Sequence, residues 1–243
     1  MCLLLVLRGR FASHPVLVAG NRDERTDRKF SPPGLWVGQR NRALSPKDRE
    51  KGGTWLCVGQ TGLFAGITNW SSLPNPGGAA TRGELPHLAV DAGSIDEAIE
   101  AVAEAVASRT YGGFQLVLAD ARRTVVLRHC DESLQVVEWE HEALLVTNEH
   151  APGELDLPGL TTALAARPTP QAQLDAMAPL LLLRGGNGAH AVLKRGEGYG
   201  TVSASLIAAS ASDPRQLVWR FSAGPPDVTE FKNYGNLGSR LVD

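Results

Sequence analysis

The sequence predicts a layered α+β domain, with two antiparallel sheets and core-facing helices, that spans residues 1–243. Three observations lead to this fold class: apolar runs spaced as hairpins, a series of closely spaced strands in the middle of the chain, and helices with one apolar face each. No repeat or linker divides the chain. With 43% hydrophobic residues among 243, the chain can bury one large core.

Two hairpins are predicted in the first third of the chain, because pairs of apolar runs are separated there by turn-forming residues. The paired runs are 3–7 with 16–19, and 54–58 with 63–68. Between the two hairpins, residues 21–42 are polar and contain Pro32-Pro33-Gly34. We therefore expect mostly loop in that segment.

Helices and further strands are predicted in the rest of the chain. The clearest helix covers residues 94–108, where Ser94 and Glu97 form a capping box. Shorter helices are expected at 81–90 and, with Thr169 as its cap, at 171–183. Residues 185–200 are rich in glycine and predict a loop. The remaining strands are expected as a four-stranded meander and a final pair, at 114–119, 124–127, 134–139, 143–147, 202–209 and 217–221.

Composition excludes several classes of function. The formal net charge is −2, and the basic residues are dispersed, so we expect no nucleic-acid partner. The three cysteines have no Cys-x-x-Cys spacing and the six histidines no His-x-x-x-His pair, so we expect no disulfide framework and no metal site. No run approaches the ~20 apolar residues of a membrane span, and the first run ends at Arg8, too early for a signal peptide. We expect a cytoplasmic protein with a small-molecule substrate or ligand; the oligomeric state stays open.

Cys2 is the first candidate for chemistry. Aminopeptidases remove an initiator Met that precedes a small residue, so we expect the mature chain to begin at Cys2. One residue would then hold a thiol and a free α-amine with an ordinary pKa of roughly 7.7–8.0. Such an amine can accept the thiol proton. The alternative is a small apolar cysteine at the end of a strand.

The segment Asn21-Arg22-Asp23-Glu24 follows the second predicted strand. If the first two strands form a hairpin, this segment returns beside Cys2, where Asp23 would orient the α-amine and Asn21 or Arg22 would hold the local loops. The alternative is a solvated turn with a few salt bridges.

Two Thr-Asn pairs also follow apolar runs, Thr68-Asn69 and Thr147-Asn148. Asparagine amides at strand ends can donate to a developing oxyanion, or they can simply begin a turn. Together with Cys2 and Asp23, they supply what acyl transfer requires: a nucleophile, a base, a residue that orients the base, and oxyanion donors.

The order of these motifs resembles the Asn-Arg-Asp-Glu (NRDE) family, also called Transport and Golgi organisation 2. The resemblance is dense over residues 1–90 and thin beyond. The matching segments are Met1-Cys2-Leu3, Ala19 to Glu24, Gly52-Gly53-Thr54-Trp55-Leu56, Gly66-Ile67-Thr68-Asn69, Arg82-Gly83-Glu84-Leu85, Thr147-Asn148 and Tyr199-Gly200-Thr201.

The family is similar to the cysteine N-terminal-nucleophile hydrolases of the penicillin V acylase and bile salt hydrolase group. That similarity implies a four-layer αββα sandwich and an amidohydrolase acting on a linear, non-peptide carbon–nitrogen or thioester bond. It also implies roles for particular residues. The catalytic set would be Cys2, Asp23, Asn69 and Asn148, and the binding set Asn21, Arg22, Glu24 and Trp55.

Two departures from those hydrolases concern arginine. The hydrolases have Arg before their Asn-x-Asp, where this chain has Gly20, and many family members have Arg after Tyr-Gly-Thr, where this chain has Val202. The resemblance therefore places no active-site arginine late in the chain.

A second function stays open beside the enzyme. The family has been linked to haem trafficking and to acyl-CoA or lipid metabolism, which implies a non-catalytic protein that binds such a ligand near Cys2. The sequence has no Cys-x-x-Cys-His for covalent haem, so a haem would be held by a Cys or His alone. For the enzyme we expect no cofactor. A third alternative is an interaction protein with no small-molecule site.

Overall fold

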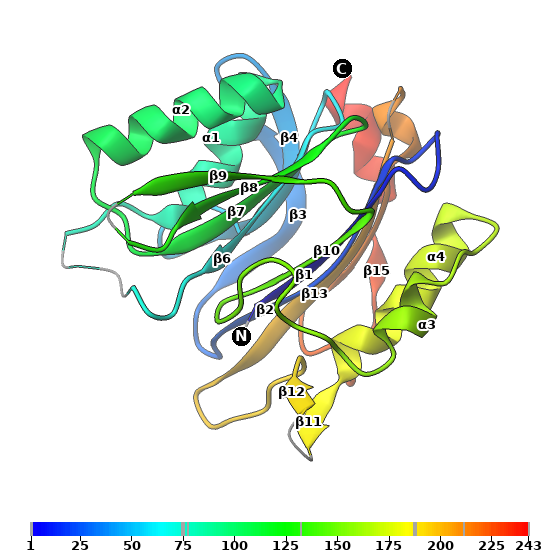
Figure 1. Cartoon of the computed structure of the whole chain (residues 1–243). Helices are drawn as coiled ribbons and strands as arrows, with labels where there is room; N and C mark the ends of the chain where they lie inside the picture. Colours follow the sequence, from blue (N-terminus) through cyan, green and yellow to red (C-terminus); the bar gives the residue numbers. More distant parts are fainter. Residues whose placement is uncertain are drawn as a thin grey trace.

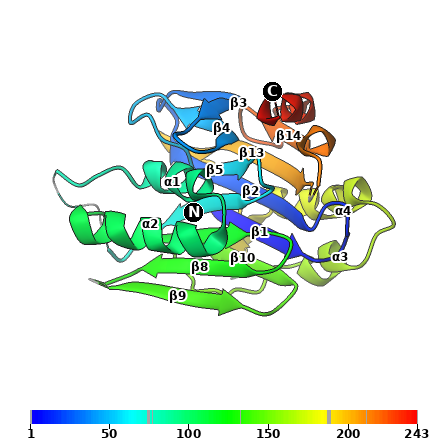
Figure 2. The same ribbon diagram turned by 90° about the horizontal axis from the view of Figure 1, so that it is seen from above.

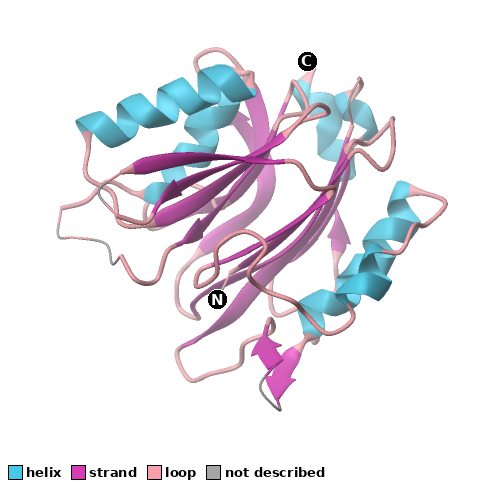
Figure 3. Ribbon diagram, viewed as in Figure 1, coloured by secondary structure: helices cyan, strands magenta, loops and turns pink. Residues whose placement is uncertain are grey.

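Four layers make up the fold, in the order helices, sheet, sheet, helices (Figure 1). The computed structural model describes residues 2–73, 76, 78–131, 133–186, 189–210 and 212–242. Two sheets pack face to face, and each carries helices on its outer face (Figure 3). The predicted αββα sandwich is therefore confirmed.

Every strand pairing within the two sheets is antiparallel. Among the described residues, the first sheet has six strands in the order β10 (Ala143–Thr147), β1 (Leu3–Arg8), β2 (Val16–Arg25), β13 (Tyr199–Ala209), β14 (Val218–Ser222) and β15 (Lys232–Asn233). The second has seven in chain order, β3 (Phe30–Val37), β4 (Arg42–Asp48), β5 (Leu56–Gly59), β6 (Phe64–Asn69), β7 (Phe114–Ala119), β8 (Thr124–His129) and β9 (Leu134–Trp139).

Helices cover the outer faces of both sheets. α1 (Leu85–Ala92), preceded by the short 3-10 helix η1 (Arg82–Glu84), and α2 (Ile95–Ser108) lie on the second sheet; α3 (Leu160–Leu164), α4 (Pro170–Met177) and η2 (Ala178–Leu182) lie on the first. The predicted cap of α2 is confirmed, since the Ser94 side chain accepts a hydrogen bond from the Glu97 N–H. The C-terminal 3-10 helix η4 (Gly235–Leu241) packs near β14, β3 and β4, next to η3 (Pro214–Gln216) (Figure 2).

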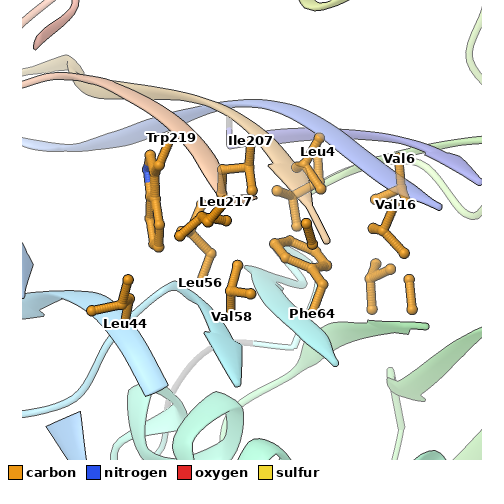
Figure 4. Close-up of a cluster of buried hydrophobic side chains, with 14 of the residues drawn as sticks. Leu4, Val6, Val16, Leu44, Leu56, Val58, Phe64, Ile207, Leu217 and Trp219 are labelled. Atoms are coloured by element: carbon orange, nitrogen blue, oxygen red, sulfur yellow. The ribbon is translucent and has the colours of Figure 1, made fainter. Parts of the chain in front are cut away.

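Three apolar clusters fill the three interfaces between layers. β1 contributes to two of them by strict alternation: Leu4 and Val6 face the opposing sheet, whereas Leu3, Leu5 and Leu7 face α3 and α4. A strand covered on both faces needs an uninterrupted apolar run, which is what residues 3–7 supply. Figure 4 shows the cluster between the sheets, in which Leu4, Val6, Val16, Ile207 and Trp219 of the first sheet oppose Leu44, Leu56, Val58 and Phe64 of the second.

The loop predicted for residues 21–42 is wrong. β2 continues to Arg25, and Phe30–Val37 form β3, a strand at the edge of the second sheet. Its pairing with β4 shifts register between Ser31 and Gly34. An edge strand with an irregularity tolerates Pro32-Pro33 because the missing N–H groups are not needed in the ladder.

The predicted meander is correct for three of its four strands. β7, β8 and β9 follow one another in the second sheet, but β10 crosses to the first sheet and pairs with β1. The loop predicted for 185–200 is partly wrong, because it contains strand residues of the small hairpin β11 (Arg184–Gly186) and β12 (Ala189–Ala191) and the start of β13. Within the described residues, no helix is long and apolar enough to cross a membrane.

Candidate functional site

Cys2 lies directly before β1, which stands between β10 and β2 in the first sheet. In β1, Leu3 pairs with Asn21 of β2 on one side and with Thr147 of β10 on the other. Cys2 is therefore next to the ends of both neighbouring strands. The expectation that the Asn21–Glu24 segment returns beside Cys2 is confirmed by this register, and the Thr147-Asn148 pair lies on the opposite side.

The two functional groups of Cys2 have separate partners. Its main-chain N lies 3.2 Å from Asn148 Oδ1, and its Sγ lies 3.7 Å from the main-chain oxygen of Asp23. Burial raises the pKa of the Cys2 thiol, and the negative charge of Asp23 raises it further, whereas the positive charge of Arg22 lowers it. The thiol is thus protonated at rest and needs a base.

Asp23 is held by β13 rather than by its own loop. Its side chain is buried, and its Oδ1 accepts a 2.7 Å hydrogen bond from Thr201 Oγ1, which itself accepts from the Lys194 N–H at 2.9 Å. Burial raises the pKa of the Asp23 carboxyl, and the Thr201 hydrogen bond opposes that rise. Tyr199 also donates to the main-chain oxygen of Asp23 at 3.3 Å. This role of Thr201 was not predicted from the sequence, where the Tyr199-Gly200-Thr201 motif is the only local signal for it.

The two Thr-Asn pairs meet at the same end of the sandwich, one from each sheet. Thr68 Oγ1 donates to the Thr147 main-chain oxygen at 3.3 Å, and the buried Gln115 Nε2 donates to that same oxygen at 2.8 Å. Asn69 is exposed at the end of β6 and lines the cleft in front of Cys2. Asn148 is buried and directs its amide oxygen at the Cys2 nitrogen. Asn148 therefore contacts Cys2 through its amide oxygen, whereas Asn69 lines the cleft that Cys2 also lines.

A layer of paired charges lies beside Cys2. Arg28 contacts both Glu24, at 3.0 Å, and Asp48. The Arg22 guanidinium is buried, stacks over the Trp55 ring at 4.3 Å, and stays 3.8 Å from Glu24 and 3.9 Å from Asp48. Burial lowers the pKa of Arg22, and this lowering is opposed by the charge of Glu24 and by the charge of Cys2 when it is a thiolate. Three of the predicted binding residues, Arg22, Glu24 and Trp55, thus lie together.

These side chains line one cleft of about 220 Å³. Its walls hold Cys2, Arg22, Asp23, Glu24, Arg28, Asp48, Lys51, Thr54, Trp55, Ile67, Asn69, Ala79, Thr81, Arg82 and Gly83. Most of these residues are polar or charged, so the cleft suits a polar reacting end of a ligand. Four charged lining residues were not predicted from the sequence: Arg28, Asp48, Lys51 and Arg82.

A close contact between two glycines brings Arg82 to this cleft. The Thr54 N–H donates to the Gly83 main-chain oxygen at 2.8 Å, and a Cβ added to Gly53 would lie 2.4 Å from the Gly83 carbonyl carbon. Only glycine permits this approach. The contact joins two of the matching segments, Gly52-Gly53-Thr54 and Arg82-Gly83, and Arg82 lines the cleft although no role was predicted for it from the sequence.

Asn21 is directed away from the cleft. Its Nδ2 donates to the main-chain oxygens of Leu181, at 2.9 Å, and Val192, at 3.2 Å. It therefore holds η2 and the residue after β12 against the first sheet, which matches the expectation that it holds local loops. It is absent from the cleft lining, so its predicted part in binding is not supported by its position.

The two departures from the hydrolase pattern have simple structural settings. A Cβ at Gly20 would lie 2.9 Å from the main-chain oxygen of Leu3, so β1 leaves little room for a side chain there. Val202 is buried where the pairing of β13 with β2 shifts register between Thr201 and Ser203. Neither position contributes to the cleft lining; Arg22 and Arg82 provide guanidinium groups instead.

Comparison with known proteins assigns the family. A model of the Transport and Golgi organisation 2 family matches residues 1–158. The chain belongs to this family. Curated homologues of Transport and Golgi organization protein 2 from Bos taurus and Homo sapiens are 34% and 33% identical to it over 113 residues, 44% of this chain. The match covers only 40% of each homologue's length.

Solved structures show the fold of this family member. A mutant of the conjugated bile acid hydrolase from Clostridium perfringens matches 98% of this chain and 94% of its own, with a TM-score of 0.53 and 11% identity. The Caenorhabditis elegans orthologue of N-acylethanolamine-hydrolyzing acid amidase matches 85% and 92%, with a TM-score of 0.53 and 11% identity. The fold is thus that of the N-terminal-nucleophile hydrolases, as the sequence predicted.

The cleft does not fit haem, the alternative ligand. Iron in haem proteins is held by His, Cys, Met or Tyr, and among the described lining residues only Cys2 is of these types. The walls carry four basic and three acidic side chains, whereas the faces of a porphyrin require apolar contacts. The described residues also contain no group of three or more His, Cys, Asp or Glu that could hold a metal ion.

Proposed function

We propose that this protein hydrolyses, or transfers the acyl group of, a linear amide or thioester, with Cys2 as its N-terminal nucleophile. The observation that carries the proposal is the arrangement around Cys2. Its nitrogen faces Asn148, its thiol faces the Asp23 main chain, and Cys2 and Asp23 both line one cleft. The shared fold supports it, because two structures with this fold are named as hydrolases.

The chemistry requires removal of Met1, which converts the Cys2 nitrogen from a peptide N–H into an amine. The amine takes the proton of the Cys2 thiol while the sulfur attacks the carbonyl carbon. The protonated amine then gives this proton to the leaving nitrogen or sulfur, and an acyl-Cys2 thioester remains. The amine next takes a proton from water, whose oxygen attacks the thioester, and it returns that proton to the departing sulfur.

The neighbouring residues divide the remaining tasks. Asp23, fixed by Thr201, favours the protonated amine by its negative charge, and Asn148 Oδ1 holds the same nitrogen. Asn69, at the open side of the cleft, donates to the oxyanion. Asn148 therefore positions the Cys2 nitrogen with its Oδ1. The oxyanion role expected from the sequence requires a donor, and in this side chain only Nδ2 can donate.

Intact-mass analysis and single-turnover acylation test the proposal. The purified chain should lack Met1, and incubation with short-chain acyl amides and thioesters should add one acyl group to Cys2 and release the corresponding acid. Cys2→Ala should abolish acylation and Cys2→Ser should lose most turnover, because the hydroxyl is a much poorer nucleophile. Cys130→Ala is the matched control and should behave as the unchanged chain.

The opposite results would identify the alternatives. Normal turnover by Cys2→Ala would rule out the mechanism. Stoichiometric binding of an acyl thioester without release of acid, in a chain that lacks Met1, would favour the non-catalytic binding function. A Cys2 thiol that reacts with thiol reagents no faster than Cys130 would favour a protein without a small-molecule site.

A further inference from the structure

Arg22 has hydrogen-bonding capacity that the protein does not use. Its side chain is only 6% exposed, and within the described part of the chain its Nη1 atom is buried without a hydrogen-bond partner. The nearest carboxylate oxygens, 3.8 and 3.9 Å from Nη2, are beyond hydrogen-bonding distance. A buried guanidinium donor without a partner is costly, and a ligand in the cleft would supply the missing acceptor.

Arg28 explains why the nearby carboxylates leave Arg22 unsatisfied. It lies between Glu24 and Asp48, donates to both, and makes their shortest ion pairs. Glu24 and Asp48 therefore accept hydrogen bonds from Arg28 and not from Arg22. Arg22 keeps their long-range attraction, which stabilises its charge, but not their hydrogen bonds.

Arg82 adds a second guanidinium that has no carboxylate partner. It donates to the Gly113 main-chain oxygen at 2.8 Å, and among the described residues no carboxylate lies within ion-pair distance of it. Burial lowers the pKa of Arg82, and the negative charge that Cys2 carries as a thiolate opposes this. The cleft lining holds four basic residues, Arg22, Arg28, Lys51 and Arg82, against three acidic ones, Asp23, Glu24 and Asp48.

We propose that the substrate carries a carboxylate close to the carbonyl carbon that Cys2 attacks, and that Arg22 and Arg82 bind this carboxylate. The inference deepens the proposed function and rests on it. Arginine suits the task, because its planar fork of donors matches the two oxygens of a carboxylate. The small volume of the cleft places the anion and the reacting carbon side by side. The substrate class is thus a carboxylate-bearing amide or thioester.

Two alkylating reagents test the anion site without any turnover. Iodoacetate and iodoacetamide both react with the Cys2 thiolate, which displaces iodide and forms a sulfur–carbon bond, but only iodoacetate carries a carboxylate next to the attacked carbon. Arginines that merely stabilise the thiolate would change both rates equally. Arginines that bind the carboxylate would raise the rate with iodoacetate only. The ratio of the two alkylation rates therefore measures recognition of the carboxylate.

The expected result is an iodoacetate-to-iodoacetamide rate ratio at Cys2 well above that of free cysteine, with saturation by iodoacetate only. Arg22→Gln and Arg82→Gln should each lower the ratio by roughly 10- to 100-fold, the equivalent of one hydrogen bond to a charged group. Arg215→Gln is the matched control, since Arg215 is exposed and outside the cleft lining, and it should leave the ratio unchanged. If Arg22→Gln fails to fold, Arg82→Gln decides alone.

A substrate pair separates the two proposals. N-hexanoylglycine and N-hexanoylethanolamine differ in a carboxylate and should differ at least about tenfold in kcat/KM, a difference lost in Arg82→Gln. Equal turnover of both amides, with an ordinary alkylation ratio, would overturn the carboxylate proposal and leave the hydrolase function intact. A raised alkylation ratio without turnover of any acyl amide or thioester would refute the hydrolase function and retain the anion site.

Discussion

Thr201 provides the sharpest test of how the site is assembled. Its hydroxyl donates to Asp23 Oδ1 at 2.7 Å and accepts from the Lys194 N–H at 2.9 Å, and it is buried. Thr201→Val preserves the shape and removes both hydrogen bonds. A hydrogen bond to a charged group contributes about 1.5–3 kcal/mol, and the orphaned N–H adds a penalty, so the free energy of unfolding should fall by about 2–4 kcal/mol near neutral pH.

The loss should depend on pH in a defined direction. Burial raises the pKa of Asp23, and the Thr201 hydrogen bond lowers it, so the substitution raises this pKa further. A carboxyl with a higher pKa in the folded than in the unfolded chain stabilises the fold below its unfolded pKa and loses that contribution as pH rises through the folded value. The deficit of Thr201→Val should therefore be larger at about pH 7 than at about pH 4.

Urea denaturation followed by tryptophan fluorescence measures both effects, with Thr201→Ser as the control that keeps the hydroxyl. The serine variant should lose only the buried methyl group, about 1 kcal/mol, at either pH. An equal loss for the two variants, or a deficit of Thr201→Val that does not change with pH, would refute the assigned hydrogen-bond role. In a chain without Met1, Thr201→Val should also slow acylation of Cys2 more than Thr201→Ser does.

Three further predictions concern the scaffold. Burial lowers the pKa of His87 to about 4, so the free energy of unfolding should fall by roughly 3 kcal/mol as pH drops from about 6.5 to about 4. His87→Gln should remove this part of the pH dependence, and a variant with the same pH profile as the unchanged chain would contradict the role of His87. Phe64→Ala, at a fully buried position between the sheets, should cost about 3–5 kcal/mol in chemical denaturation, and a loss below about 1 kcal/mol would contradict the packing. Gly53→Ala should be destabilising because its Cβ would lie 2.4 Å from Gly83, whereas Gly34→Ala, with open space around it, should be nearly neutral by thermal unfolding; equal melting temperatures would count against the contact.

Local patterns were sufficient to predict most elements and one part of the site. The first two strands are adjacent in sequence and joined by a short turn, so their pairing and the return of Asn21–Glu24 to Cys2 followed from the hairpin alone. The cap of α2 was equally local. Where a local signal misled, as at Pro32-Pro33, the position of β3 at the edge of a sheet removed the usual penalty for proline.

Contacts between distant segments could not be predicted in this way. The pairing of β10 with β1 and the hydrogen bond from Thr201 to Asp23 join residues more than 130 positions apart. The alternation of residues that predicts a strand does not predict which other strand it will pair with. The same holds for Arg82, which lines the cleft beside the close contact of Gly53 with Gly83.

The sequence by itself determined the family and the layered fold, and it predicted Cys2 as the candidate nucleophile, because motif order and apolar periodicity are properties of the chain. Only the tertiary structure decided which face each polar side chain occupies. Asn21 and Arg22 are neighbours in β2 and point to opposite sides, so Arg22 lines the cleft while Asn21 donates to η2 and to the residue after β12. The position of each layer, set by contacts across the whole chain, assigns these neighbouring residues to different tasks.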